Sequence, residues 1–253
     1  MRLLTQARDL RRRRAREERG VFVAEGVRAV EELLRSPLAV RGVLVAPQLD
    51  GAQRGAALHA RLATSGLDVL EVSERDFASA AETESPQGVL AIAEIPARAF
   101  PEPVGEAPVR VVVLDAVQDP GNVGTIVRTA AALGADATVA LPGTVDLWNA
   151  KVVRGAMGAH FVHPAFASTL ADLQAWAGRV EASLWGADRS GQPFGRDAAP
   201  PRRLALCMGN EGAGLTPAVR AACERLVAIP LADSVESLNV AVATGILLQA
   251  VRP

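Results

Sequence analysis

Three segments of the chain share one pattern, a short apolar run followed by a loop of glycine and small polar residues. They are Leu114–Arg128, Leu204–Leu215 and Ile229–Val240. Such a run is typical of a buried strand in a parallel sheet, where the loop at its carboxyl end leads toward a helix. Ligands of open α/β sheets bind outside those carboxyl ends. We therefore expect an α/β fold in which three loops build one site.

A proline-rich stretch divides the chain into two parts. Residues 95–108 contain four prolines, which block helices and interrupt strand pairing. With 253 residues, 49% of them apolar, the chain is long enough for two cores. We predict an N-terminal domain at residues 1–95, a linker at 96–108 and a C-terminal domain at 109–253.

Helical and strand patterns alternate before the linker, which predicts a small α/β domain. Its expected helices lie at 26–34, 52–64 and 74–80, and its expected strands at 40–45, near Val69 and at 88–93. After the linker, strands are expected at 109–115, 137–141, 180–185, 204–208 and 226–229, with helices at 123–133 and 238–251. This second pattern predicts a mostly parallel sheet with helices on both faces.

The helix expected at 123–133 holds one cation, Arg128. At about 100° per residue, Val123, Ile126 and Ala130 form an apolar stripe, and Arg128 falls roughly opposite to it. The side chain therefore points away from the core of its own helix and lies close to a glycine loop.

Motifs of several enzyme classes are missing from the sequence. It has no Walker A or dinucleotide-binding glycine pattern and no G-x-S-x-G. His160 and His163 have no carboxylate or thiol neighbours in the sequence, so we expect surface residues and no metal site. Gly209, Gly212 and Gly214 let the main chain approach a ligand and adopt positive φ. A site of backbone groups suits a flat adenine and a ribose, and its polar side chains are Asn122, Arg128, Asn210, Glu211, Ser237 and Asn239.

Each of these side chains also has a purely structural interpretation. Ser237 or Asn239 could cap the last helix. Asn122 could stabilise the turn before its own helix. Glu211 could be a solvated loop acid, and Arg128 an ordinary surface arginine. Their joint occurrence favours a functional site.

The three segments resemble the motifs of SpoU-type RNA ribose 2′-O-methyltransferases in the SPOUT superfamily. Asp119–Ala130, Met208–Leu215 and Ile229–Val240 carry the resemblance and follow the order of the family. Phe22–Leu33 resembles the ribosomal-protein-like domain that binds substrate in many of these enzymes. The resemblance implies S-adenosylmethionine as methyl donor, an RNA substrate, a homodimer formed through the C-terminal domain, and a trefoil knot, which is rare among folds.

The same resemblance assigns roles to individual residues. Catalysis is expected of Arg128, Ser237 and Asn239, with Asn122 and Glu211 completing the site. Cofactor binding is expected of Met208, Gly209, Asn210, Gly212, Ile229, Leu231 and Leu238. Lys151 and Arg154 lie in a further family-like segment and are expected to touch RNA. Asp233 stands where relatives have a glycine, and we expect its side chain to be accommodated at the surface.

The net charge of −1 hides a basic N-terminal arm. Residues 1–20 hold eight arginines and three acids, a local charge of +5, which leaves −6 for the rest. Arginine suits bidentate phosphate contacts, although charged runs are often simply solvated. We expect Arg11, Arg12, Arg13 and Arg14 to bind RNA, with ribosomal RNA favoured over tRNA. A noncatalytic RNA-binding protein is the alternative.

The sequence also bears on where the protein is found. No apolar segment follows the arginines of the arm, and the longest apolar run near the C-terminus is too short to span a bilayer. Neither a secretory signal nor a membrane contact is therefore expected. We expect a cytoplasmic protein.

Overall fold

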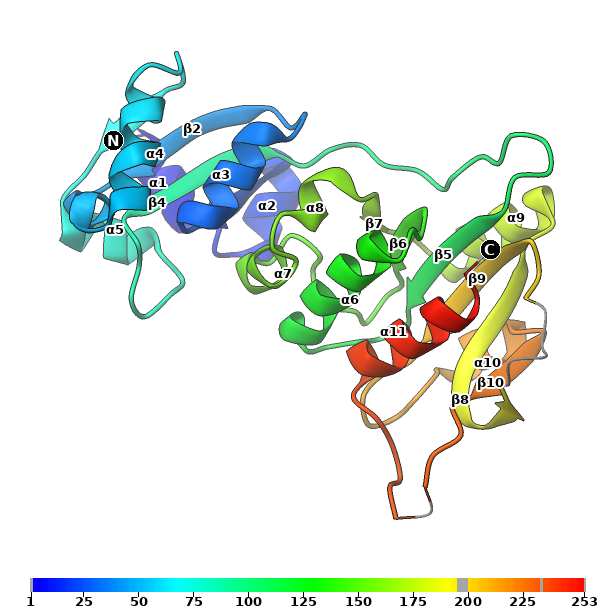
Figure 1. The fold of residues 1–253 in the computed structure, drawn as a ribbon. Helices are drawn as coiled ribbons and strands as arrows, with labels where there is room; N and C mark the ends of the chain where they lie inside the picture. The colour runs from blue at the N-terminus through cyan, green and yellow to red at the C-terminus, as the bar shows by residue number, and fades with distance from the viewer. Residues whose placement is uncertain (1, 195–199, 233, 253) are drawn as a thin grey trace. The chain divides into compact units, whose positions relative to one another are not determined.

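The chain forms two compact units in the computed structural model, which describes residues 2–194, 200–232 and 234–252 (Figure 1). The N-terminal unit consists of Met1–Ala97 and Trp148–Val162, and the C-terminal unit of Arg98–Leu147 and His163–Pro253. Each unit has its own sheet. Within the described ranges, no helix combines the length and the apolar character that crossing a membrane requires.

A mixed sheet of four strands forms the centre of the N-terminal unit, in the order β1-β4-β2-β3. Strand β4 (Val89–Glu94) pairs antiparallel with both β1 (Val21–Glu25) and β2 (Val40–Val45). Strand β3 (Val69–Glu71) runs parallel to β2. The expected small α/β domain is confirmed.

Helices pack against this sheet through apolar side chains. Leu3, Leu4 and Ala7 of α1 (Arg2–Asp9) join a core that also contains Phe77 of α5 (Glu74–Ala80). The other helices of the unit are α2 (Arg13–Arg19), α3 (Val27–Arg35), the 3₁₀ helix η1 (Pro47–Gly51), α4 (Gln53–Ala63), α7 (Ala150–Gly155) and α8 (Ala159–Val162).

The C-terminal unit contains a six-stranded sheet in the order β10-β8-β9-β5-β6-β7. All of its strand pairs are parallel, which confirms the expected parallel sheet. The strands are β5 (Val109–Leu114), β6 (Ala137–Ala140), β7 (Ala165–Ala167), β8 (Ser183–Pro193), β9 (Arg203–Met208) and β10 (Arg225–Ala228). Because β5 and β9 are almost wholly buried, both faces of the sheet centre must be covered.

Helices cover both faces of this sheet (Figure 1). On one face, α6 (Pro120–Ala132) lies beside α11 (Val240–Ala250). These two helices pack so closely that a Cβ on Gly245 would lie 3.4 Å from Cγ2 of Thr129. On the other face lie α9 (Leu170–Val180) and α10 (Pro217–Ala222).

The expectation that His160 and His163 lie at the surface is wrong. His160 is 1% exposed and its ring lies 4.2 Å from that of Trp148. His163 is 5% exposed and shares a hydrogen bond of 2.9 Å with the hydroxyl of Thr138. Burial, together with the charge of Arg98, lowers the pKa of His163 to about 4, so its ring is neutral at pH 7.

Candidate active site

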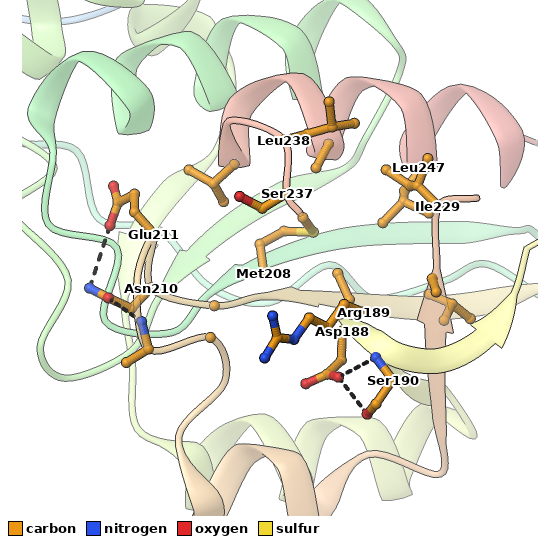
Figure 2. Close-up of a pocket in the computed structure, with 18 of the residues that line it drawn as sticks. Asp188, Arg189, Ser190, Met208, Asn210, Glu211, Ile229, Ser237, Leu238 and Leu247 are labelled. Carbon is orange, nitrogen blue, oxygen red and sulfur yellow. Dashed lines mark hydrogen bonds between the residues drawn. The ribbon is translucent and has the colours of Figure 1, made fainter. Parts of the chain in front are cut away.

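A pocket of about 740 Å³ lies at the carboxyl ends of β9 and β10 (Figure 2). The loop after β9, the segment after β10 and the segment before α11 all contribute to its lining. Its volume is within the range of small-molecule sites, about 300 to 1,000 Å³. All seven residues expected to bind the cofactor line it: Met208, Gly209, Asn210, Gly212, Ile229, Leu231 and Leu238.

The three glycines of the loop after β9 differ in what they do. A Cβ on Gly209 would lie 2.3 Å from the carbonyl carbon of Gly214 and 2.4 Å from the nitrogen of Leu215, so only glycine fits there. Gly214 has a φ of 71°, which favours glycine. Gly212 has neither constraint, since its nearest contact would be Oδ1 of Asn210 at 3.8 Å. Of the three, Gly214 is the one that uses the freedom of glycine to adopt positive φ, and Gly209 is the one that allows a close main-chain approach.

Asn210 holds the loop in shape. Its main chain and that of Gly214 exchange two hydrogen bonds, of 2.9 and 3.0 Å. The side-chain oxygen accepts from the N–H groups of Gly212 and Ala213, each at 3.0 Å, and the amide nitrogen donates to the carbonyl of Ala116 at 2.9 Å. The loop is thus preorganised by its own hydrogen bonds.

A directed chain of hydrogen bonds links three of the predicted catalytic residues. Nδ2 of Asn122 donates to Glu211 at 3.0 Å, and Nδ2 of Asn239 donates to Oδ1 of Asn122 at 2.8 Å. Oδ1 of Asn239 accepts from the backbone N–H of Ala241 at 2.9 Å. A carboxylate only accepts and a backbone N–H only donates, so both ends of the chain fix how the two amides are turned.

Glu211 is an acceptor for several donors at once. Besides Asn122, the backbone N–H groups of Asp119 and Gln118 donate to its carboxylate, at 3.2 and 3.4 Å. Burial alone would raise the pKa of Glu211, but these hydrogen bonds outweigh it and hold the pKa below its ordinary value. The side chain is ionised at neutral pH and joins the loop after β9 to the start of α6.

The last helix is capped by Asn239, not by Ser237. Helix α11 begins at Val240, and the side chain of Asn239 accepts hydrogen bonds from Ala241 and Val242. Ser237 instead lines the pocket, on the side opposite the β8 residues in Figure 2. Asn122 does not cap its own helix either, because Asp119 is the N-cap of α6.

Replacing Asn239 by aspartate should separate capping from catalysis. Aspartate still accepts the helix N–H bonds, but it has no N–H to donate to Asn122. We expect the capping contribution to thermal stability to be kept and about a tenfold loss of the methyl transfer that the sequence motifs imply, the equivalent of one hydrogen bond. Asn239→Ala should lose the same activity and about 1 kcal/mol of stability as well. Equal activities of Asn239→Asp and wild type would contradict a role for the hydrogen-bond chain.

Arg128 is not one of the residues that line the pocket. Its side chain is exposed on α6, nearly two turns after Asn122, as its place opposite the apolar stripe predicts. Of the five predicted catalytic residues, Glu211 and Ser237 line the pocket, Asn122 is hydrogen-bonded to Glu211, and Asn239 is hydrogen-bonded to Asn122. Arg128 therefore does not form part of the walls of the pocket.

Strand β8 supplies lining residues that the sequence analysis missed. Asp188, Arg189 and Ser190 line the pocket opposite Leu238 (Figure 2), and Arg220 of α10 joins them. Burial would raise the pKa of Asp188, but hydrogen bonds from Ser190 and Arg220 hold it below its ordinary value. Polar residues follow the apolar run that ends at Ala187, and this pattern could have predicted their place in the pocket. The rule is the one used for the other loops, that ligands bind at the carboxyl ends of parallel strands.

The residues expected to bind RNA lie in the N-terminal unit. Lys151 is exposed in the first turn of α7, and Arg154 is partly buried in the same helix. Arg11 to Arg14 are exposed. Arg12, Arg13 and Arg14 form ion pairs with Asp9, Glu17 and Glu18, respectively. Asp233, the departure in the third loop, lies outside the described residues.

Comparison with protein families gives two matches. Residues 109–249 match the SpoU rRNA Methylase family, and residues 3–91 match the MRM3-like substrate binding domain. The first match contains the pocket-forming segments after β9 and β10. The second covers the mixed sheet of the N-terminal unit.

Individual relatives align along nearly the whole chain. A 23S rRNA (guanosine(2553)-2′-O)-methyltransferase of Bacillus subtilis is 35% identical over 244 residues, covering 96% of this chain and 93% of that protein. A 23S rRNA (uridine(2479)-2′-O)-methyltransferase of Streptomyces viridochromogenes is 31% identical over 258 residues, covering 95% and 85%. The solved structure of the SpoU methyltransferase AviRb of Streptomyces viridochromogenes in complex with AdoMet has a TM-score of 0.88 at 29% identity, covering 98% and 96%.

Proposed function

We infer the reaction from one premise, that the chain belongs to the SpoU rRNA methylase family. It is an RNA ribose 2′-O-methyltransferase that uses S-adenosylmethionine. The observation that carries this inference is the pocket of about 740 Å³, whose lining combines the second and third sequence motifs. A family match alone would not require those two motifs to meet in one cavity.

The pocket fits the methyl donor chemically. Its walls combine apolar side chains, among them Met208, Ile229 and Leu238, with the main chain around Gly209. This suits an adenine ring and a ribose, and we propose that the main chain at Gly209, Ile229 and Leu238 holds the adenosine and methionine portions. When bound, S-adenosylmethionine supplies an electrophilic methyl group.

The chain must align a weak nucleophile, the ribose 2′-hydroxyl, and favour the loss of its proton. We propose that Arg128 does this by binding the phosphate next to the target ribose and stabilising negative charge on the oxygen. A guanidinium is permanently protonated, so Arg128 orients and stabilises, and the phosphate or solvent accepts the proton. Asn122, Glu211, Ser237 and Asn239 form the polar edge of the site.

Large-subunit ribosomal RNA is the substrate that we propose. The names of the Bacillus subtilis and Streptomyces viridochromogenes relatives both specify 23S rRNA, and both align over more than 80% of their length. The match of residues 3–91 to a substrate-binding domain supports an N-terminal domain at 1–95 that binds this RNA, joined by residues 96–108 to a methyltransferase domain. We propose that this methylation takes place in the cytoplasm.

A homodimer formed through the C-terminal unit is also part of the proposal. Helix α11 exposes Val242 and Ile246, which are 52% and 44% accessible to solvent. Both lie on the same helix as the N-cap Asn239, one turn apart from each other. Covering them with a second copy of α11 would remove apolar surface from water next to the site.

The proposed function can be tested by mapping 2′-O-methylated nucleotides in total RNA from cells with and without the protein. We expect one methylation in large-subunit rRNA to disappear and to return with the wild-type gene. A loss confined to tRNA would replace the proposed substrate. An unchanged map, together with no binding heat for S-adenosylmethionine in calorimetry, would favour the noncatalytic alternative.

RNA binding by the basic arm should weaken steeply with salt. Changing Arg11, Arg12, Arg13 and Arg14 to glutamine should weaken binding and reduce the slope of log K against log salt by about 0.7 to 0.9 for each lost phosphate contact. Fluorescence anisotropy over a sodium chloride series measures both. Three of these arginines already pair with acids. A slope identical to that of wild type would therefore show that the arginines stabilise the arm and do not contact RNA phosphates.

A further inference from the structure

A second pocket, of about 300 Å³, lies within the N-terminal unit. Three segments form it: residues 25–29 at the start of α3, residues 83–87 before β4, and residues 154–157 at the end of α7 and in the turn after it. The last segment contributes Arg154 and Met157, and the first contributes Arg28. This pocket shares no lining residue with the methyl-donor site.

Two cations in this pocket have no counterion among the residues that the structure describes. Many arginines of the unit pair with acids, as Arg41 does with Glu94 and Arg54 with Glu31. Within the described part of the chain, neither Arg28 nor Arg154 forms a side-chain hydrogen bond or an ion pair. Nη1 of Arg154 is also shielded from solvent and has no acceptor there. A buried donor without an acceptor is unfavourable, and an incoming oxyanion would offset that cost.

The one acid that lines the pocket does not satisfy these cations. Glu25 is 6% exposed, and its carboxylate accepts from the backbone N–H groups of Glu82 and Thr83, at 2.8 and 3.3 Å, and from the hydroxyl of Thr83. With its oxygens engaged in this way, Glu25 fixes the 83–87 segment. The charged groups of the pocket, Arg28, Arg154 and Glu25, sum to +1.

The wall that carries Arg154 is held in place by close packing. A Cβ on Gly158 would lie 2.8 Å from Cβ and Cγ of Glu32 on α3, so glycine allows the turn after α7 to approach α3. The residue before it, Met157, has a φ of 49°, an uncommon conformation for a side chain without a local hydrogen-bonding group. Met157 is 37% exposed and lines the pocket. The turn is thus strained at a residue that lines the pocket.

We propose that this pocket binds one phosphodiester group of the RNA substrate, held by the guanidinium groups of Arg28 and Arg154. Guanidinium forks match phosphate oxygens, and arginine is the preferred partner for planar, bidentate recognition. The apolar edge at Met157 and Ala29 then lies against the adjoining ribose. The inference deepens the proposed function and rests on it, because it assumes that the N-terminal unit meets RNA.

The test measures RNA affinity across a salt series for wild type and for Arg28→Gln, Arg154→Gln and the double variant. The probe is a transcribed fragment of large-subunit rRNA that contains the nucleotide identified by methylation mapping. We expect the double variant to bind at least about tenfold more weakly, with a salt slope smaller by roughly 0.7 to 0.9, the value for one phosphate. Arg41 is an exposed and paired arginine of the same unit, so Arg41→Gln removes one charge, as each single variant does, and should bind like wild type.

Calorimetry with S-adenosylmethionine and thermal unfolding show that each variant is folded. Wild-type affinity and slope in the double variant would overturn the pocket assignment while leaving the proposed function intact. A wild-type protein that fails to bind or methylate RNA would instead defeat the proposed function. Inorganic phosphate is the second probe, and we expect it not to bind at micromolar concentration. If phosphate bound at micromolar concentration to wild type but not to the double variant, the pocket would be a site for a free anion. That result would overturn the assignment to RNA.

Discussion

Replacing Gly209 by alanine should abolish binding of S-adenosylmethionine and methyl transfer together. The added Cβ would lie 2.3 to 2.5 Å from main-chain atoms of Gly214 and Leu215, far inside van der Waals contact. Main chain cannot rotate aside as a flexible side chain can, so the loop after β9 must open. A displacement of about 1 Å in a positioned site lowers the reaction rate on the order of 100-fold. Calorimetry should show no binding heat for the donor, and a methyl-transfer assay should show the loss of rate.

Two further glycines make the comparison specific. A Cβ added to Gly178 on α9 would have no described atom within 4 Å, so Gly178→Ala should bind the donor like wild type. Gly212→Ala lies in the same loop as Gly209 but meets only Oδ1 of Asn210 at 3.8 Å, so its loss should be much smaller. Donor affinity of Gly209→Ala equal to that of Gly178→Ala would show that the loop is not the binding element.

The convergence of the loops after β9 and β10 could be predicted because parallel strands place their carboxyl ends at one edge of a sheet. Buried runs such as Val109–Leu114 and Arg203–Met208 give a clear apolar signal. Strand β8 was predicted to end at Trp185 but continues to Pro193. Its second half is largely exposed and polar, so hydrophobicity alone could not reveal that it reaches the pocket.

Features of the N-terminal arm were hidden by its charge. Arginine dominates the composition of residues 1–20, yet Leu3, Leu4 and Ala7 place α1 in the core. Arg16 is buried and donates to the carbonyl of Leu10 at 2.6 Å, which no charge count predicts. Strand β1 escaped prediction because its apolar run, Val21 to Ala24, is only four residues long and gives too little periodicity to separate strand from helix.

The choice of helix cap shows the limit of local sequence signals. Ser237 and Asn239 both have good capping side chains and lie two residues apart. Which of them caps α11 depends on where the first helical turn packs, and the close approach of α11 to α6 sets that position. Only the structure shows that capping and the link to Asn122 fall on the same side chain, Asn239.

Replacing Arg128 by lysine should lower methyl transfer by about 100- to 1,000-fold, the usual effect of removing one positioned charge-stabilising donor. Lysine keeps the charge but loses the planar fork that grips a phosphate by two hydrogen bonds. Arg128 lies outside the pocket lining, so affinity for S-adenosylmethionine should not change, and the loss should fall on turnover at saturating donor.

Arg179→Lys is the matched control for this change, because Arg179 is an exposed arginine of the same unit that pairs with Glu102. It should leave turnover as in wild type. If Arg128→Lys also kept near-normal turnover, a point charge would suffice at this position, and bidentate positioning of the RNA phosphate would be excluded. If Arg128→Lys lost donor affinity instead, the side chain would belong to the cofactor pocket, contrary to its exposed place on α6.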